Sequence, residues 1–178
     1  MHICDHETFD WMPDAPSGYE AGSLRRAWKD LKWLKTAAFA AEQFSTCAKR
    51  QYLAIILDAD GFILGMGYNG SPPGMAHCSD GACPRLAENS ASGSSYGNCI
   101  AVHAEANALL HTDWHQRKGG TIVVNGPPCW DCAKLISNSG LVRVVYKSDD
   151  NYADWPKAQQ ILGNSGVSTI GYHPTLLR

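Results

Sequence analysis

The sequence predicts an α/β protein of three layers, α-β-α, in which a mixed five-stranded sheet has helices on both faces. Two short apolar runs joined by an Asp-Gly turn predict a β-hairpin, and helix-like and strand-like patterns alternate after residue 102. A hairpin contributes antiparallel strands, whereas repeated αβ units contribute parallel ones, so the sheet is mixed. The 178 residues, 44% of them apolar, suffice for one domain with its own core.

The N-terminal part divides at Ser23. Residues 1–22 are broken by two prolines and a glycine, so we expect an irregular extension to a domain at 23–178. Ser23 is a suitable N-cap for a helix whose apolar residues recur at helical spacing: Leu24, Trp28, Leu31, Leu34, Ala38 and Ala41. We interpret this stripe as a core face rather than a docking site for a partner helix. We expect the charged residues at the intervening positions of this helix to face solvent: Arg25, Arg26, Lys29 and Asp30.

The remaining elements follow in order. Residues 52–57 and 62–67 form the predicted hairpin around Asp58–Gly61. Residues 68–99, rich in Gly, Pro, Ser, Asn and Cys, make a loop far longer than usual, which indicates function or a metal tether. Beyond it, helices are predicted at 103–110, 129–137 and 155–162, and strands at 121–124, 141–146 and 167–170.

Composition excludes several classes of protein. With 15 Lys and Arg against 17 Asp and Glu, the net charge of −2 does not favour tight, non-specific binding to nucleic acid. No apolar run is long enough for a transmembrane helix, and the polar N-terminus lacks the pattern of a secretory signal, so we expect a cytoplasmic protein. In that reducing compartment, cysteines bind metal more often than they form disulfides. The seven cysteines of this chain therefore favour a metal site.

Two short segments carry the chemistry: His-Ala-Glu from His103 and Pro-Cys-Trp-Asp-Cys from Pro128. One imidazole and two thiolates, from His103, Cys129 and Cys132, fill three positions of a tetrahedral zinc and leave the fourth open for water. The proline marks the start of a helix, so both cysteines lie on one face of its first turn. The positive end of that helix favours the thiolate form.

Glu105 follows His103 by two residues, close to the metal but free of it. A proton carrier between an activated water and a substrate belongs at such a position. This combination of H-x-E with P-C-x-x-C is the known signature of zinc-dependent nucleobase deaminases. A lone C-x-x-C would equally suit a redox or structural zinc motif, but a structural site needs a fourth protein ligand and no paired acid.

Beyond these motifs, the chain resembles the deoxycytidylate deaminases of the cytidine deaminase superfamily over about residues 24–170. The matching segments are 45–47, 67–72, 77–78, 98–108 and 128–136. Gly-Tyr-Asn-Gly-Ser-Pro at 67–72 points to the deoxycytidylate branch. The resemblance implies a cytidine deaminase-like fold and zinc-dependent hydrolytic deamination of dCMP to dUMP and ammonia, which feeds thymidylate synthesis.

The resemblance also implies roles for residues. His103, Cys129 and Cys132 would hold the catalytic zinc, while Glu105 would carry protons. Substrate contacts would come from Asn69 at the sugar hydroxyl, the backbone at Ala104 and Pro128 at the pyrimidine edge, and Tyr152 near the base. For the 5′-phosphate, the nearest cations in the sequence are Lys49 and Arg50, with Arg25, Arg26 and Lys29 behind them.

The remaining cysteines fit a second, structural zinc of the kind that recurs in this family. Its ligands would be Cys47, Cys78, Cys83 and Cys99, with His77 able to replace one thiolate. The alternative is that several of these are ordinary buried thiols.

The chain departs from the family at the first strand, where Tyr52-Leu53-Ala54-Ile55 replaces the usual Val-Gly-Ala-Val. Residues 111–115 lack the Phe and Arg that some relatives use at an effector-linked interface. By resemblance we expect a homo-oligomer, a hexamer or smaller, with dCTP and dTTP as effectors and Mg²⁺ accompanying them. Other substrates stay open: 5-modified dCMP, dCTP and deoxycytidine. A deaminase of tRNA or single-stranded DNA fits the charge less well, and a non-catalytic zinc scaffold would not need Glu105.

Overall fold

A computed structural model describes residues 21–91, 96–149 and 152–177 and contains a five-stranded sheet. The strands are β1 (Leu53–Leu57), β2 (Ile63–Tyr68), β3 (Thr121–Val124), β4 (Arg143–Lys147) and β5 (Ser168–Tyr172), in the order β2-β1-β3-β4-β5. Strand β1 pairs antiparallel with β2 and β3, whereas β3, β4 and β5 are mutually parallel. The predicted mixed sheet is therefore confirmed.

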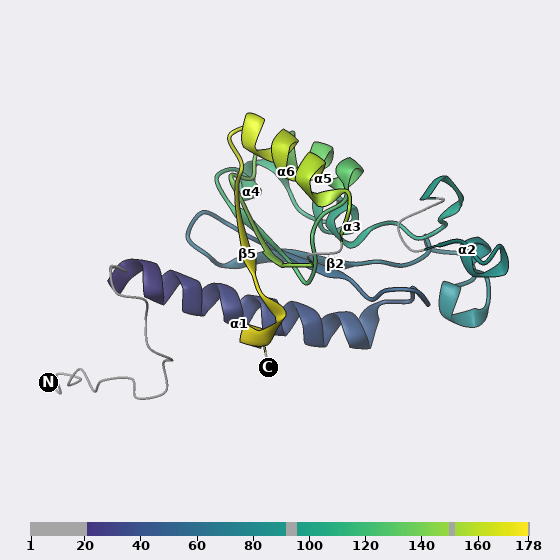
Figure 1. The fold of residues 1–178 in the computed structure, drawn as a ribbon. Coiled ribbons are helices and arrows are strands. Elements are labelled where there is room, and N and C mark those ends of the chain that lie inside the picture. The colour runs from purple at the N-terminus through teal and green to yellow at the C-terminus, as the bar shows by residue number, and fades with distance from the viewer. Residues whose placement is uncertain (1–20, 92–95, 150–151, 178) are drawn as a thin grey trace, which may run out of the picture.

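Helices cover both faces of the sheet, which confirms the three-layer prediction. They are α1 (Ala21–Phe44), α2 (Pro84–Ala87), α3 (Ala104–Leu110), α4 (Trp114–Arg117), α5 (Trp130–Ser137) and α6 (Trp155–Asn164), with single 3₁₀ turns η1 (Cys78–Asp80), η2 (Tyr96–Asn98) and η3 (Pro174–Leu177). Figure 1 shows α1 below the sheet and α3, α5 and α6 above it. Within the described ranges, no helix is long and apolar enough to span a membrane.

Helix α1 corrects two predictions. It already includes Ala21, so Ser23 lies inside the helix and is not its N-cap, and the predicted extension falls almost wholly outside the described residues. Its buried side includes Leu34, Ala37 and Ala41, which pack on alternate residues of β1. The charged Asp30, expected in solvent, belongs to this buried side and is only 4% exposed.

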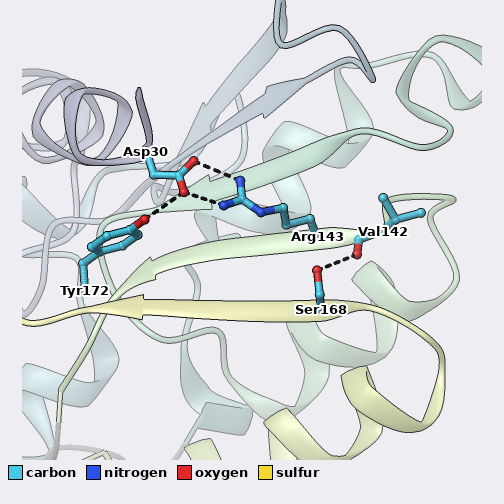
Figure 2. Close-up of polar contacts among 5 residues, drawn as sticks. All are labelled: Asp30, Val142, Arg143, Ser168 and Tyr172. Carbon is cyan, nitrogen blue, oxygen red and sulfur yellow. Dashed lines mark hydrogen bonds and ion pairs between the residues drawn. The ribbon is translucent and has the colours of Figure 1, made fainter. Parts of the chain in front are cut away.

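A buried ion pair explains the position of Asp30. Its carboxylate accepts hydrogen bonds from both terminal nitrogens of Arg143 on β4, one of them at 2.9 Å. The Tyr172 hydroxyl on β5 donates to the same carboxylate at 2.9 Å. Beside this cluster, the Ser168 hydroxyl donates to the Val142 carbonyl at 3.2 Å and joins the starts of the two parallel strands (Figure 2). Helix α1 is thus tied to β4 and β5 by charge as well as by apolar packing.

On the opposite face, α3 lies unusually close to the hairpin. A methyl group added at Gly67 of β2 would lie 2.2 Å from the backbone nitrogen of Ala108 and 2.7 Å from the carbonyl oxygen of Ala104. Because only glycine permits this approach, α3 packs directly on the strand backbone. This contact sets the distance between the sheet and α3, and with it the position of the histidine that precedes the helix.

Candidate active site

The two segments expected to hold zinc meet where α3 and α5 begin. His103 is the residue before α3, and Cys129 is the residue before α5. The Nδ1 atom of His103 lies 3.3 Å from Sγ of Cys129 and 3.5 Å from Sγ of Cys132. Tetrahedral zinc, with bonds of about 2.3 Å to sulfur and about 2.0 Å to nitrogen, separates such ligands by roughly 3.5 Å. The ligand atoms of the three residues therefore lie at distances that suit a bound zinc ion, and they form the group that the sequence predicted.

Electrostatics favour the thiolate form at Cys129, whereas a hydrogen bond with Cys129, together with burial, raises the pKa of Cys132. Hydrogen bonds from Cys132 and His103 lower the pKa of Cys129 to about 4, even though burial opposes this. The pKa of His103 is raised, chiefly because its ring hydrogen-bonds to Cys129. The backbone N–H of Cys132, in the first turn of α5, also donates to Sγ of Cys129. A thiolate at this position is the form that ligates metal.

Glu105 lies in the first turn of α3 and is buried, with 5% of its surface exposed. Burial raises the pKa of its carboxyl above the usual value of 4.5, and the negative charge of Cys129 raises it further. A carboxyl whose pKa moves towards neutrality can both accept and release a proton. This is the property expected of the predicted proton carrier.

His103, Glu105 and Cys129 line a cavity of about 350 Å³, a size that suits a small ligand. Its wall combines the metal-binding end with cations, aromatic rings and small residues: Cys47, Lys49, Arg50, Tyr52, Asn69, Arg85, Leu86, Cys99, Ala101, His103, Ala104, Glu105, Pro127, Cys129 and Tyr152. Among the predicted substrate contacts, Asn69, Ala104, Arg50 and Tyr152 are on this wall. Pro128 is fully buried, and its neighbour Pro127 lines the cavity.

Asn69 organises the wall by bonding to three residues of the segment between α1 and β1. Its side-chain oxygen accepts from the Ser45 hydroxyl at 2.5 Å and from the backbone N–H of Tyr52 at 2.8 Å. Its amide nitrogen donates to the carbonyl of Arg50 at 2.8 Å. Asn69 therefore joins the end of β2 to the segment that leads into β1.

Tyr52 lines the cavity and is the first residue of the segment in which this chain departs from the usual family sequence. Its ring occupies space that a side chain at position 126 would fill, since a methyl group on Gly126 would lie 2.2 Å from it. Its hydroxyl accepts a hydrogen bond from Arg50, which also forms an ion pair with Asp149 at 3.3 Å. The neighbouring Leu53, which replaces the family's glycine, instead packs under α1 on the opposite face of the sheet.

The four cysteines of the predicted second zinc site are neighbours without forming a tight cluster. Burial raises the pKa of Cys78 to about 11, helped by a hydrogen bond to Cys83 and by the nearby Cys47 and Cys99. Of the residues that the structure describes, only the set at His103 has three ligand atoms within 4.8 Å of one another.

Arg85 was missed by the sequence analysis. It belongs to α2, and its side chain is buried in the wall of the cavity, with 6% of the residue exposed. In the sequence it follows a proline inside a polar loop, where arginine is normally solvated. Only its position next to the cavity distinguishes it.

Comparisons with known proteins agree with this geometry. Residues 28–148 match the cytidine and deoxycytidylate deaminase zinc-binding region. A deoxycytidylate deaminase of Mycobacterium phage D29 is 43% identical over 117 residues, covering 63% of this chain and 89% of the relative. A deoxycytidylate deaminase of Schizosaccharomyces pombe is 33% identical over 153 residues, covering 85% of this chain but only 46% of the longer relative.

A solved structure shows the same architecture. The dCMP deaminase of the cyanophage S-TIM5, determined in complex with dCMP and dUMP, superimposes with a TM-score of 0.62 at 25% identity. The match covers 86% of this chain and all of that protein. With its family motif, its fold and its His-Cys-Cys group in agreement, the chain belongs to the cytidine and deoxycytidylate deaminase family.

Proposed function

We propose that this protein is an enzyme that hydrolyses dCMP to dUMP and ammonia and so supplies the precursor of thymidylate. The observation that carries the proposal is the burial of Glu105 next to the His103, Cys129 and Cys132 group, at the wall of a nucleotide-sized cavity. The deoxycytidylate deaminases among its relatives, and the dCMP and dUMP bound by the S-TIM5 protein, support the choice of substrate.

In this mechanism His103, Cys129 and Cys132 hold the zinc. When bound, the ion acts as a Lewis acid that makes a water molecule nucleophilic near neutral pH. Glu105 accepts the proton that this water loses and passes it to N3 of cytosine. Once the C4–O bond has formed, Glu105 takes the proton of the new C4 hydroxyl and delivers it to the amine. The C4–N bond then breaks, ammonia leaves, and C4 becomes the carbonyl of the uracil ring.

The rest of the cavity binds and orients the nucleotide. We assign the sugar hydroxyl to Asn69, the pyrimidine edge to the backbone at Ala104 and Pro128, and one face of the base to Tyr152. Their support is that Asn69, Ala104 and Tyr152 line the cavity together with Glu105. For the 5′-phosphate we assign Arg50, which lines the cavity together with Lys49, the other of the two cations nearest in the sequence.

The test is the variant Glu105→Gln, which keeps the shape of the side chain but cannot carry protons. We expect deamination of dCMP to fall by about 100-fold or more, the usual contribution of a positioned acid–base group, with zinc content and thermal stability retained. Glu42→Gln, on the exposed side of α1, is the matched control and keeps full activity. Parental activity in Glu105→Gln would contradict the mechanism.

Parallel rates on dCMP, 5-methyl-dCMP, dCTP and deoxycytidine identify the substrate. A preference for dCMP supports the proposal, and a preference for another member of the series redirects it to that nucleotide or nucleoside. Zinc-loaded protein that is inactive on all four would favour a scaffold role.

We also propose a second, structural zinc held by Cys47, Cys78, Cys83 and Cys99 or by His77 in place of one thiolate. The Nδ1 atom of His77 is buried and finds no hydrogen-bond partner within the described ranges, which suits a ligand. The proposal predicts a second equivalent of zinc that Cys78→Ser and Cys83→Ser lose while the first remains. A single equivalent in the parent protein would refute it.

Finally, we propose a homo-oligomer, a hexamer or smaller. Exposed apolar side chains support it, because Ile63, Met66 and Tyr68 lie along β2 and Phe44 stacks on Tyr68. Light scattering of the purified protein measures the assembly. Activation by dCTP, inhibition by dTTP and a role for Mg²⁺ stay predictions, tested by adding each nucleotide with and without the metal.

A further inference from the structure

The residues proposed to carry out the reaction come from two helices. His103 and Glu105 lie at the start of α3, and Cys129 and Cys132 lie at the start of α5. Groups that act together at a reacting centre must be held within about 0.5 Å of their productive geometry. The position of one helix relative to the other therefore decides whether the acid and the metal group are correctly arranged.

Small side chains pack much of the space around these two helices. Helix α3 buries Ala104 and Ala108, and α5 buries Ala133 and Ile136, in the same apolar cluster. The close approach at Gly67 sets the distance of α3 from the sheet. Alanine makes fewer van der Waals contacts than a large side chain does, so such packing resists sideways movement of a helix only weakly. The spacing of α3 and α5 along the sheet calls for a further constraint.

Arg117, the last residue of α4, reaches the far ends of both helices. Its Nη1 donates to the carbonyl of Leu109, in the last turn of α3, at 2.9 Å and to the carbonyl of Thr112 at 2.5 Å. Its Nε donates to the carbonyl of Ser139, just beyond the end of α5, at 3.0 Å. A single half-buried guanidinium thus bridges the C-terminal ends of the two helices.

The carbonyls that Arg117 binds belong to residues fixed to their helices. Ser139 is only 3% exposed, and its hydroxyl donates to the carbonyl of Ile136 in α5 at 2.7 Å. The hydroxyl of Thr112 donates to the carbonyl of Ala108 in α3 at 2.9 Å. A cation at these ends also complements the partial negative charge of the last carbonyls of a helix. Movement of Arg117 is therefore passed to both helices.

Helix α4 in turn holds the backbone of Arg117. Its N-cap Asp113 accepts a hydrogen bond from the backbone N–H of His115 at 2.8 Å. After the helix, the N–H of Gly119 donates to the carbonyl of Gly140, in the loop that follows α5, at 2.8 Å. Arginine suits this position because its planar fork carries donors in fixed directions, whereas lysine offers a single point charge.

We propose that Arg117 is a positioning residue for the deamination reaction: by bridging the far ends of α3 and α5, it fixes the acid and the histidine of one helix relative to the two cysteines of the other. A shift at the far end of either helix tilts it on the sheet and displaces the groups at its start. This inference rests on the proposed deaminase function and extends it to a residue outside the cavity wall.

The test uses Arg117→Lys, which keeps the positive charge but cannot bridge separate carbonyls with a planar fork. We expect kcat for dCMP to fall by about 10- to 100-fold, the usual cost of disturbing groups that orient metal ligands. KM should stay within about twofold, because Arg117 does not line the cavity. Lys118→Gln, at the exposed neighbouring position, removes a full charge from the same segment and should change neither constant.

Cobalt in place of zinc provides a readout that needs no substrate, since the visible absorption of Co²⁺ depends on the geometry of its ligands. We expect Arg117→Lys to shift these bands and to weaken cobalt binding by about tenfold or more. Lys118→Gln should reproduce the parent spectrum. Asp30→Ala controls for stability, because it removes a buried ion pair on the α1 side of the sheet and should leave the cobalt spectrum unchanged.

Should Arg117→Lys not fold, Arg117→Gln replaces it under the same expectations, since it leaves no half-buried charge without its partners. Parental kcat and spectrum in the Arg117 variant, a rise confined to KM, or an equal spectral shift in Asp30→Ala would overturn the positioning role while deamination stands. A parent protein that deaminates none of the four substrates, while the Arg117 variant still shifts the cobalt bands, would overturn the deaminase function and retain the role of Arg117 at the metal group.

Discussion

Replacing Asp30 with alanine removes the carboxylate that holds Arg143 and Tyr172 beneath helix α1. Both ends of the ion pair are buried, with side-chain exposures of 6% for Asp30 and 11% for Arg143. The variant therefore leaves a guanidinium that has lost both of its hydrogen bonds to the carboxylate, and a tyrosine hydroxyl that has lost its acceptor. Because this cluster lies on the α1 side of the sheet, the active-site geometry is unaffected in the folded molecules.

The expected cost is large because the remaining partner stays buried. Removing one member of a buried ion pair costs about 3–5 kcal/mol in the free energy of unfolding. For a domain of this size, each kcal/mol shifts the melting temperature by about 2–4 °C, so the total shift is about 6–20 °C. Replacing both charges by apolar residues, as in Asp30→Leu with Arg143→Met, should restore most of the stability, since no buried charge is then left.

Thermal and denaturant unfolding, followed by circular dichroism, measure the difference. The control is Lys134→Ala, which breaks the exposed ion pair with Asp131 on α5 and should cost less than about 1 kcal/mol. If Asp30→Ala were no less stable than Lys134→Ala, the buried pair would not contribute to the attachment of α1. Failure of the double variant to recover stability would show that shape, rather than uncompensated charge, dominates at this position.

Two further variants probe the packing around the cavity. Gly67→Ala forces α3 away from β2, so it should cost about 1–3 kcal/mol in unfolding free energy and also lower turnover. The control is Gly163→Ala, whose added methyl group meets no atom within 4 Å, and it should leave the protein equally or slightly more stable. For Tyr52, burial raises the pKa of the phenol above 10. The unfolded phenol then ionises first, so its contribution to stability is complete below pH 10 and is lost as the pH rises through the folded pKa. Tyr52→Phe should flatten that alkaline decline in melting temperature, and an unchanged profile would refute the assignment.

The sequence predicted the elements whose signals are local. The hairpin, strand β3 and helices α3, α5 and α6 were recognised because apolar periodicity and turn residues lie within each segment. His103 and Cys129 were identified for the same reason, since the residue types and their spacing carry the chemistry. The four-residue helix α4 was not predicted, because it is too short to show a period.

What the sequence missed depends on partners far along the chain. Asp30 was placed in solvent because its partner, Arg143, is 113 residues away. Arg85 looks like a surface residue until the wall of the cavity encloses it. In the same way, the importance of Tyr52 appears only where its ring passes over Gly126.

The residues that carry out the reaction and the residues that shape the rest of the cavity wall lie in different parts of the fold. His103, Glu105 and Cys132 are held at the starts of two helices packed on the sheet, whereas Lys49 and Tyr152 come from connecting segments and Arg85 from the single-turn helix α2. Loops accept substitutions and insertions more readily than packed helices do. Selection can therefore change which nucleotide is admitted without disturbing the hydrolytic step. In an engineered variant, exchange of the wall residues that lie outside these two helices would alter ligand preference while the metal ligands stay in place.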